Sequence, residues 1–161
     1  MKWQRHCALV AVGTLLCLGA ATGAQAQQTW SGDGNTMLAP LTVEKYQLPD
    51  GRMVRAMSFN GFTVTEDKES PFHLASQDCK GTYLFEADGE NFTAAGHCVS
   101  RDADGDVWWI WWNGGPTGGD FGVTGGVGKY AGMTGGGTWT ARTPMPDGKI
   151  VNSWHGEMNM K

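Results

Sequence analysis

The sequence has little helical patterning and no excess of positive charge. After the first 26 residues, no segment repeats apolar residues at sustained helical spacing, which excludes an all-α domain. The chain carries 12 Lys and Arg against 16 Asp and Glu, a formal net charge of −4. An acidic chain lacks the basic surface that nucleic acids require, and no basic amphipathic segment indicates membrane binding. We therefore expect no nucleic-acid partner and, after loss of a leader, no membrane attachment.

Motifs for phosphate binding, dinucleotide binding and serine hydrolysis are also missing. In the glycine-rich stretch Gly125–Trp139, the lysine is followed by tyrosine, whereas a phosphate loop needs serine or threonine there. Its glycine spacing is one residue too long for a dinucleotide fingerprint, and no G-x-S-x-G elbow is present. His73, His97 and His155 show no ligand spacing. We expect no cofactor, and we expect the glycines to let the chain bend tightly beside a sheet.

The N-terminus has the layout of a secretory signal peptide. A basic start and an apolar run from Ala8 to Ala21 precede an A-x-A cleavage site that ends at Ala26. The apolar run is shorter than the ~20 residues of a transmembrane helix. We expect an exported protein, periplasmic or secreted, with a signal peptide at 1–26, a flexible lead-in at 27–40 and a single domain at 41–161.

The remaining sequence contains short β-rich runs separated by glycine, proline and acidic turns. This pattern is typical of an all-β sandwich or barrel. Strands are expected at Arg52–Glu66, Gly81–Ala87, Asn91–Ser100, Val107–Trp112, Gly137–Arg142 and Ile150–Met160.

One hairpin follows in detail from its turn residues and its cysteines. Asp88-Gly89 is typical of a type I′ turn, and Cys79 and Cys98 are the two cysteines that remain after the leader is lost. A two-residue loop there predicts these cross-strand pairs: Phe85 with Phe92, Tyr83 with Ala94, Gly81 with Gly96, and Cys79 with Cys98. Directly opposed strand residues lie within reach of a disulfide, so the hairpin predicts a Cys79–Cys98 bond in an oxidising compartment.

A second hairpin is expected around the acidic loop Asp102–Asp106. In the following run, VWWIWW, both faces of the strand are apolar, so the strand is either covered on both sides or lines a cavity. The loop resembles the start of a calcium-binding loop but lacks its later glycine and glutamate. We interpret it as an acidic turn and predict no metal site, with Asp102, Asp104 and Asp106 as weak candidates for a cation.

The motif G-x-G-K-Y-A-G-x-x-G-x-G-T, from Gly126 to Thr138, resembles the signature of the allene oxide cyclase-like barrel proteins. The segment Gly96–Trp109 is similar to the one that precedes this motif in exported bacterial members. The resemblance implies a calycin-type, dirigent-related antiparallel barrel of about eight strands. Plant allene oxide cyclases bind an unstable fatty-acid epoxide in an apolar cavity and guide its ring closure. Their polar residues match no positions here, so no catalytic residue is carried over.

Aromatic side chains are the most suggestive candidates for a site. They serve either as core packing or as the wall of a pocket for an apolar ring or chain. The pocket candidates are Tyr83, Phe85, Trp108, Trp112, Trp139 and Trp154.

Three function classes follow from this composition. The first is a protein that binds a small apolar molecule without turnover, and it is favoured because no catalytic constellation is visible. The second is an isomerase, an intramolecular cyclase acting on a reactive apolar substrate. The third is a structural or interaction protein with an exposed tryptophan face. The first two predict an enclosed cavity of ~300 Å3 or more, and the oligomeric state stays open.

Overall fold

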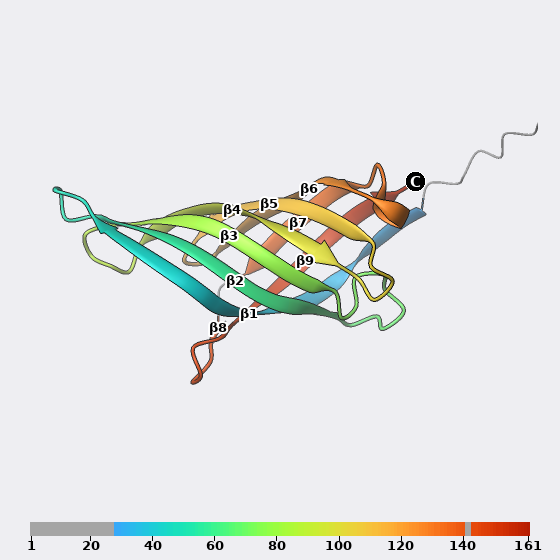
Figure 1. The fold of residues 1–161 in the computed structure, drawn as a ribbon, viewed down its shortest axis with the longest axis horizontal. Helices are drawn as coiled ribbons and strands as arrows, with labels where there is room; N and C mark the ends of the chain where they lie inside the picture. Colours follow the sequence, from blue (N-terminus) through green and yellow to red (C-terminus); the bar gives the residue numbers. More distant parts are fainter. Residues whose placement is uncertain (1–27, 141–142) are drawn as a thin grey trace, which may run out of the picture.

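The chain forms a closed antiparallel β-barrel in the computed structural model, which describes residues 28–140 and 143–161 (Figure 1). The predicted signal peptide lies outside these described residues. The strands are β1 (Gln28–Gln47), β2 (Met53–Thr65), β3 (Ser76–Phe85), β4 (Phe92–Arg101), β5 (Val107–Gly115), β6 (Gly118–Gly126), β7 (Thr134–Thr140), β8 (Thr143–Pro144) and β9 (Ile150–Met160). A single 3-10 turn, η1 (Gly128–Tyr130), precedes β7. Within the described ranges, no helix is long and apolar enough to cross a membrane.

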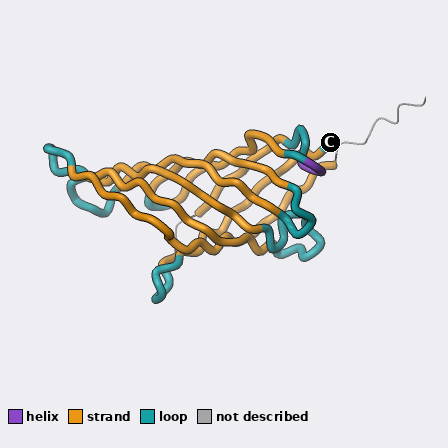
Figure 2. The backbone as a smooth tube through the Cα atoms, in the orientation of Figure 1, coloured by secondary structure: helices purple, strands orange, loops and turns teal. Residues whose placement is uncertain are grey.

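Eight strands close the barrel, and the course of its wall can be followed in Figure 2. Each of β1 to β6 pairs with the next strand, β7 pairs with β9, and β9 pairs back to β1. The two-residue strand β8 pairs only with β9 and forms a hairpin that projects from the wall. The all-β barrel of about eight strands expected from the sequence is therefore confirmed.

Residues 28–40, expected as a flexible lead-in, instead form the first part of β1. They pair with β9 from Gln28 opposite Met160 to Leu38 opposite Ile150, and with β2 on the other side. Alternate side chains of this segment, including Thr36 and Leu38, are buried inside the barrel. The expectation was wrong because the polar and small residues hid this alternation.

The hairpin built on the cysteines is confirmed in register. All four predicted pairs are present, including Cys79 opposite Cys98, and these two cysteines form the disulfide. The turn type was wrong. Leu74 is the only non-glycine residue with positive φ in the described part of the chain, so Asp88 does not adopt a type I′ turn. The Gly89 N–H instead donates to the Glu86 carbonyl, with Gly89 at a φ of 74°.

Strand β6 was missed by the sequence analysis because its sequence, GGDFGVTGG, has few side chains to show alternation. It lies between β5 and β7 and completes the wall. The glycine-rich stretch that begins at Gly125 therefore covers the end of β6, η1 and nearly all of β7. The expected tight bend lies around η1, where Gly128 and Gly132 have positive φ, whereas Thr134–Trp139 belongs to the sheet itself.

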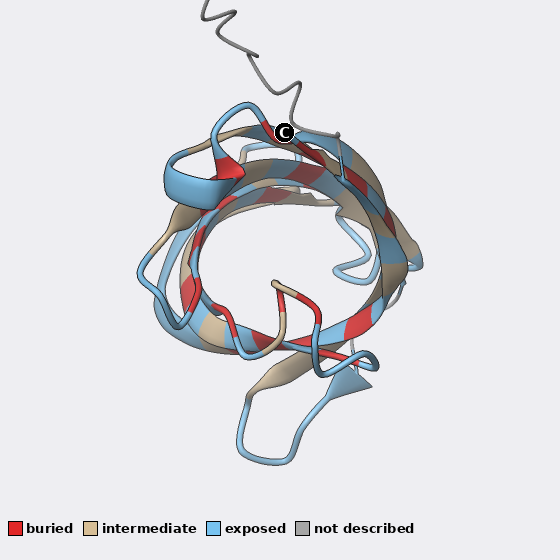
Figure 3. Ribbon diagram, turned by 90° about the vertical axis from the view of Figure 1, so that its right-hand side faces the viewer, coloured by how far each residue is buried: buried red, intermediate tan, exposed pale blue. Residues whose placement is uncertain are grey.

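The two ends of the barrel differ. At one end, the connection between β2 and β3, residues 66–75, folds in across the ring of strands (Figure 3). At the other end, β1 and β2 extend as a hairpin beyond the last pair that β1 forms with β9 (Figure 2). We call these the covered end and the open end.

Candidate functional site

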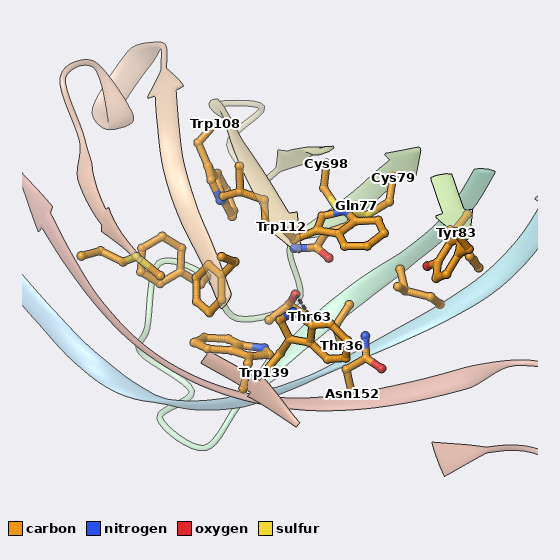
Figure 4. Close-up of a pocket in the computed structure, with 17 residues that line it drawn as sticks. Thr36, Thr63, Gln77, Cys79, Tyr83, Cys98, Trp108, Trp112, Trp139 and Asn152 are labelled. Atoms are coloured by element: carbon orange, nitrogen blue, oxygen red, sulfur yellow. Dashed lines mark hydrogen bonds between the residues drawn. A yellow bond between two sulfur atoms is a disulfide. The ribbon is translucent and has the colours of Figure 1, made fainter. Parts of the chain in front are cut away.

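The barrel encloses a cavity of about 100 Å3 (Figure 4). Five of the six predicted pocket residues line it: Tyr83, Trp108, Trp112, Trp139 and Trp154. Phe85 does not line it and instead packs beside it, 6.3 Å from the Tyr83 ring and 5.1 Å from the Phe92 ring. The cavity is smaller than the ~300 Å3 expected for a drug-sized ligand.

The two faces of β5 have different surroundings. Trp108 and Trp112 point into the barrel and are 4% and 9% exposed. Trp109 and Trp111 lie on the outer face and are 36% and 40% exposed. Of the two alternatives left open by the sequence, the strand lines a cavity with one face.

Glycines in neighbouring strands leave room for the inward tryptophans to lie against the wall. A Cβ atom on Gly34 would lie 2.4 Å from Trp154, and a Cβ on Gly81 or Gly96 would lie 2.4 Å from Trp112. These distances are far below a van der Waals contact, so only glycine fits without displacing the indole. The indole rings of Trp112 and Trp154 therefore lie against the barrel wall, which leaves space along the barrel axis.

One side of the cavity carries a short row of polar side chains that sequence reasoning missed. Thr36 lies opposite both Asn152 and Thr63, and the two threonine hydroxyls are 3.1 Å apart. Gln77 of β3 also faces the cavity (Figure 4). Asn152 Oδ1 is buried and has no hydrogen-bond partner among the described residues. The spacing of Thr36 two residues before Leu38 was the available signal, but β1 was not recognised as a strand.

Among the described residues, no acidic or basic group faces the cavity. The side chains of residues 28–140 and 143–161 that line it include no carboxylate, imidazole, ammonium or guanidinium group. His155 and Glu157 of β9 alternate with the inward residues and are exposed on the outside. The cavity can therefore surround an apolar body, and its described polar side chains can hydrogen-bond a polar group on it.

Phe72 closes the cavity at the covered end. It is 3% exposed and lines the cavity. Its ring meets Trp30 edge-on at 4.9 Å and Trp108 at 5.4 Å, and it stacks on Tyr130 at 6.0 Å. The 66–75 connection is thus anchored by an aromatic cluster rather than lying free over the opening.

Tyr130 fastens this connection to the acidic loop. Its hydroxyl lies 2.8 Å from the Pro71 carbonyl and 2.9 Å from Asp102 Oδ2, and its side chain is fully buried. Burial, and then the hydrogen bond and charge of Asp102, raise the pKa of Tyr130 far above its ordinary value. The hydroxyl therefore stays protonated and can donate. We call the Pro71–Tyr130–Asp102 contact the latch.

Lys129 completes the latch and occupies the predicted weak cation site. Its Nζ lies 2.8 Å from both Asp102 Oδ2 and Asp104 Oδ2, and its backbone N–H approaches Asp106. Burial alone would raise the pKa of Asp102, but hydrogen bonds from Lys129 and Tyr130 lower it below its ordinary value. Across residues 28–140 and 143–161, no group of three or more potential metal-ligating side chains is present.

The fold and its interior define an eight-stranded antiparallel barrel with an aromatic cavity. Several solved structures are similar to it, and two of them are described here. One is a protein of unknown function of the DUF3224 family from Shewanella oneidensis MR-1, 12% identical, with 81% of this chain and 96% of that chain covered and a TM-score of 0.49. The other is the pterocarpan synthase dirigent protein GePTS1, 14% identical, with 94% of this chain and 97% of that chain covered and a TM-score of 0.49. No protein-family model matches the sequence, and no curated protein matches it significantly. At this distance, neither structure assigns an activity to the chain.

Proposed function

We propose that this protein binds a small apolar molecule in the barrel cavity and holds it without chemical turnover. The observation that carries the proposal is an aromatic cavity with a single polar row, in which the buried Asn152 Oδ1 lacks a partner among the described residues. Buried acceptors are nearly always hydrogen-bonded, so an unpartnered one facing a cavity favours a ligand that donates to it.

The volume limits the size of that ligand. An engineered apolar cavity of ~150 Å3 binds benzene, and the cavity here is of similar scale at about 100 Å3. A single aromatic ring with one hydroxyl matches both the volume and the polar row. A larger ligand has to extend toward the open end, because Phe72 and the latch close the other end.

Binding is favoured over cyclisation by the chemistry of the wall. An isomerase that moves protons needs a group whose pKa lies near the working pH, and the lining side chains offer none. The exposed Trp109 and Trp111 keep an interaction role as an alternative, and that role predicts a partner protein instead of a small molecule.

We also propose that the chain is an exported member of the allene oxide cyclase-like family. The glycine-rich motif from Gly126 to Thr138 supports this family. The disulfide supports export into an oxidising compartment. Mass measurement of the mature protein tests cleavage after Ala26, and a leader found intact on the exported chain contradicts it.

The binding proposal is tested by titrating the purified protein with phenol and benzene and measuring the thermal shift or the heat of binding. Thr63→Phe fills the cavity from β2, whereas Val64→Phe places the same ring on the outer face and serves as the control. We expect Thr63→Phe to abolish binding and Val64→Phe to retain it. Asn152→Leu is expected to weaken phenol binding more than benzene binding.

Two results would overturn the binding proposal. One is a folded wild-type protein that takes up neither compound at millimolar concentration. The other is a folded Thr63→Phe variant that still binds both. Recovery of a chemically altered ligand would move the assignment to an isomerase.

A further inference from the structure

We propose that the outer face of β5, β6, β7 and β9 docks an extended, arginine-bearing segment of a partner protein. Two exposed tryptophans, Trp109 and Trp111, and two exposed carboxylates, Asp120 and Glu157, carry this proposal. We call the surface that they form the acidic aromatic face. Because this face lies outside the barrel, docking of the segment does not depend on a ligand in the cavity.

The two tryptophans of this face lie over glycines of the next strand. Trp109 is opposite Gly125, and Trp111 is opposite Gly122. A Cβ atom on Gly122 would lie 2.6 Å from Trp111 Nε1, and one on Gly125 would lie 2.9 Å from Trp109 Cε2. Each indole therefore has one side against the β6 backbone, where it buries Gly122, and its other side open to solvent.

The open sides of these rings are suited to a cation. Indole is the aromatic side chain that attracts cations most strongly. Among residues 28–140 and 143–161, no lysine or arginine lies over Trp109 or Trp111. The partner can therefore supply the cation.

Two free carboxylates stand beside the rings. Asp120 precedes Gly122 by two residues on β6, so it is a diagonal neighbour of Trp111 with ~7–8 Å between their Cα atoms. Glu157 lies in the same cross-strand row as Trp111, separated from it by Gly122 and Gly136. Neither carboxylate forms an ion pair with a cation of the described residues.

The strands that form this face carry a negative charge without compensation. No lysine or arginine occurs in β5, β6, β7 or β9, which lie side by side in the wall (Figure 1). The acidic residues of these strands are Asp120 and Glu157, and both are exposed on the outer side. The one histidine, His155, lies 3.0 Å from Asp33 of β1. A partner of complementary charge must therefore be basic.

The surroundings of the tryptophans set the side on which the partner lies. Lys80 of β3 and Arg101 of β4 are exposed on the other side of β5, where they would repel a basic segment. The segment therefore extends from the tryptophans over β6, β7 and β9. The carboxylates disfavour a nucleic acid or an anionic lipid there, and copies of a chain with a net charge of −4 repel one another.

The spacing of the carboxylates matches an extended peptide. Asp120 and Glu157 are two strands and two residues apart, which gives ~12 Å between their Cα atoms. Residues i and i+4 of an extended chain are ~13 Å apart and point to the same side. Arginine fits better than lysine, because its planar guanidinium can bind a carboxylate and stack on an indole.

The experiment uses a seven-residue peptide of glycine and serine with arginine at its second and sixth positions. A second peptide has glutamine at both positions. Dissociation constants are measured by calorimetry at low salt for the wild type, Asp120→Asn, Glu157→Gln, the double variant and Trp111→Leu. Glu90→Gln is the matched control, since it removes an exposed carboxylate from the β3–β4 turn. The indole N–H signals are followed by nuclear magnetic resonance.

We expect the wild type to bind the arginine peptide about 10-fold more tightly than the glutamine peptide. Each carboxylate variant should weaken binding about 3-fold, the double variant about 10-fold, and Trp111→Leu about 3-fold. Glu90→Gln should leave it unchanged. The peptide should shift the indole signals of Trp109 and Trp111 and leave those of Trp108 and Trp112 in place.

Three results would overturn the basic partner. One is equal affinity for the two peptides, or no binding of either at millimolar concentration. Another is binding of the arginine peptide that the double variant leaves unchanged. The third is tighter binding of a neutral oligosaccharide, cellohexaose, which would assign the tryptophans to a glycan. None of these results bears on phenol binding in the cavity, which is measured separately.

Discussion

The latch makes a quantitative prediction for the variant Tyr130→Phe. The substitution keeps the fully buried ring and removes only the hydroxyl, which lies 2.8 Å from the Pro71 carbonyl and 2.9 Å from Asp102. A neutral hydrogen bond contributes ~1 kcal/mol and one to a charged group ~1.5–3 kcal/mol. In the variant, Asp102 keeps its contacts with Lys129 and with the amides of the acidic loop, so the loss of unfolding free energy is smaller than the sum of both hydrogen bonds. We therefore expect a net loss of ~2 kcal/mol.

The assay is urea and thermal unfolding of the two proteins at pH 7. For a domain of this size, ~2 kcal/mol corresponds to a fall in Tm of ~6 °C. The control is Tyr46→Phe, which removes a hydroxyl that donates to Glu44 on the exposed outer face and should leave Tm unchanged. If Tyr130→Phe also leaves Tm unchanged, the hydroxyl does not hold the covered end and the interpretation of the motif as a latch is wrong.

Three further predictions concern acid, reduction and the glycine–tryptophan contacts. The pKa of Asp102 is lowered in the fold, so its contribution to stability is complete above its unfolded value of 3.8 and is lost as pH falls through the folded pKa. Urea unfolding should therefore show that the stability gap between wild type and Asp102→Asn narrows below pH 3.8; a constant gap contradicts this. Reducing the disulfide, which joins residues 19 apart, should cost ~3 kcal/mol in unfolding free energy, and equal stability before and after reduction would refute its role. Gly34→Ala should displace Trp154 and lower the free energy of unfolding by ~1–3 kcal/mol. Gly125 faces the exposed Trp109, so Gly125→Ala should be tolerated because that indole can move into solvent. Equal losses for the two variants in the same unfolding assay would show that the Gly34–Trp154 contact does not require glycine.

The sequence predicted those parts of the fold in which turn chemistry and side-chain alternation agree. The cysteine hairpin is such a case, since Phe85, Tyr83 and Cys79 alternate with polar residues up to a glycine turn. The turn type escaped prediction because Asp-Gly also suits a turn in which only the glycine has positive φ. Strand β1 escaped because its pairing with β9 joins segments more than 100 residues apart, and no local pattern reports such a contact.

The aromatic residues of the site could be predicted from the sequence, whereas its row of polar side chains could not. Strict alternation in VWWIWW placed Trp108 and Trp112 on the same face of the strand. Which of the two faces points into the barrel could be told only from the structure. Asn152 and Thr36 come together only through β1–β9 pairing.

The central claim, that the barrel interior is a binding site, is tested most directly by native mass spectrometry of the protein purified without denaturation. We expect one small apolar molecule per chain, or uptake of one molecule of phenol when the protein is purified empty. An empty protein that takes up neither phenol nor benzene would contradict the claim and would favour the alternative of a partner bound at the exposed Trp109 and Trp111.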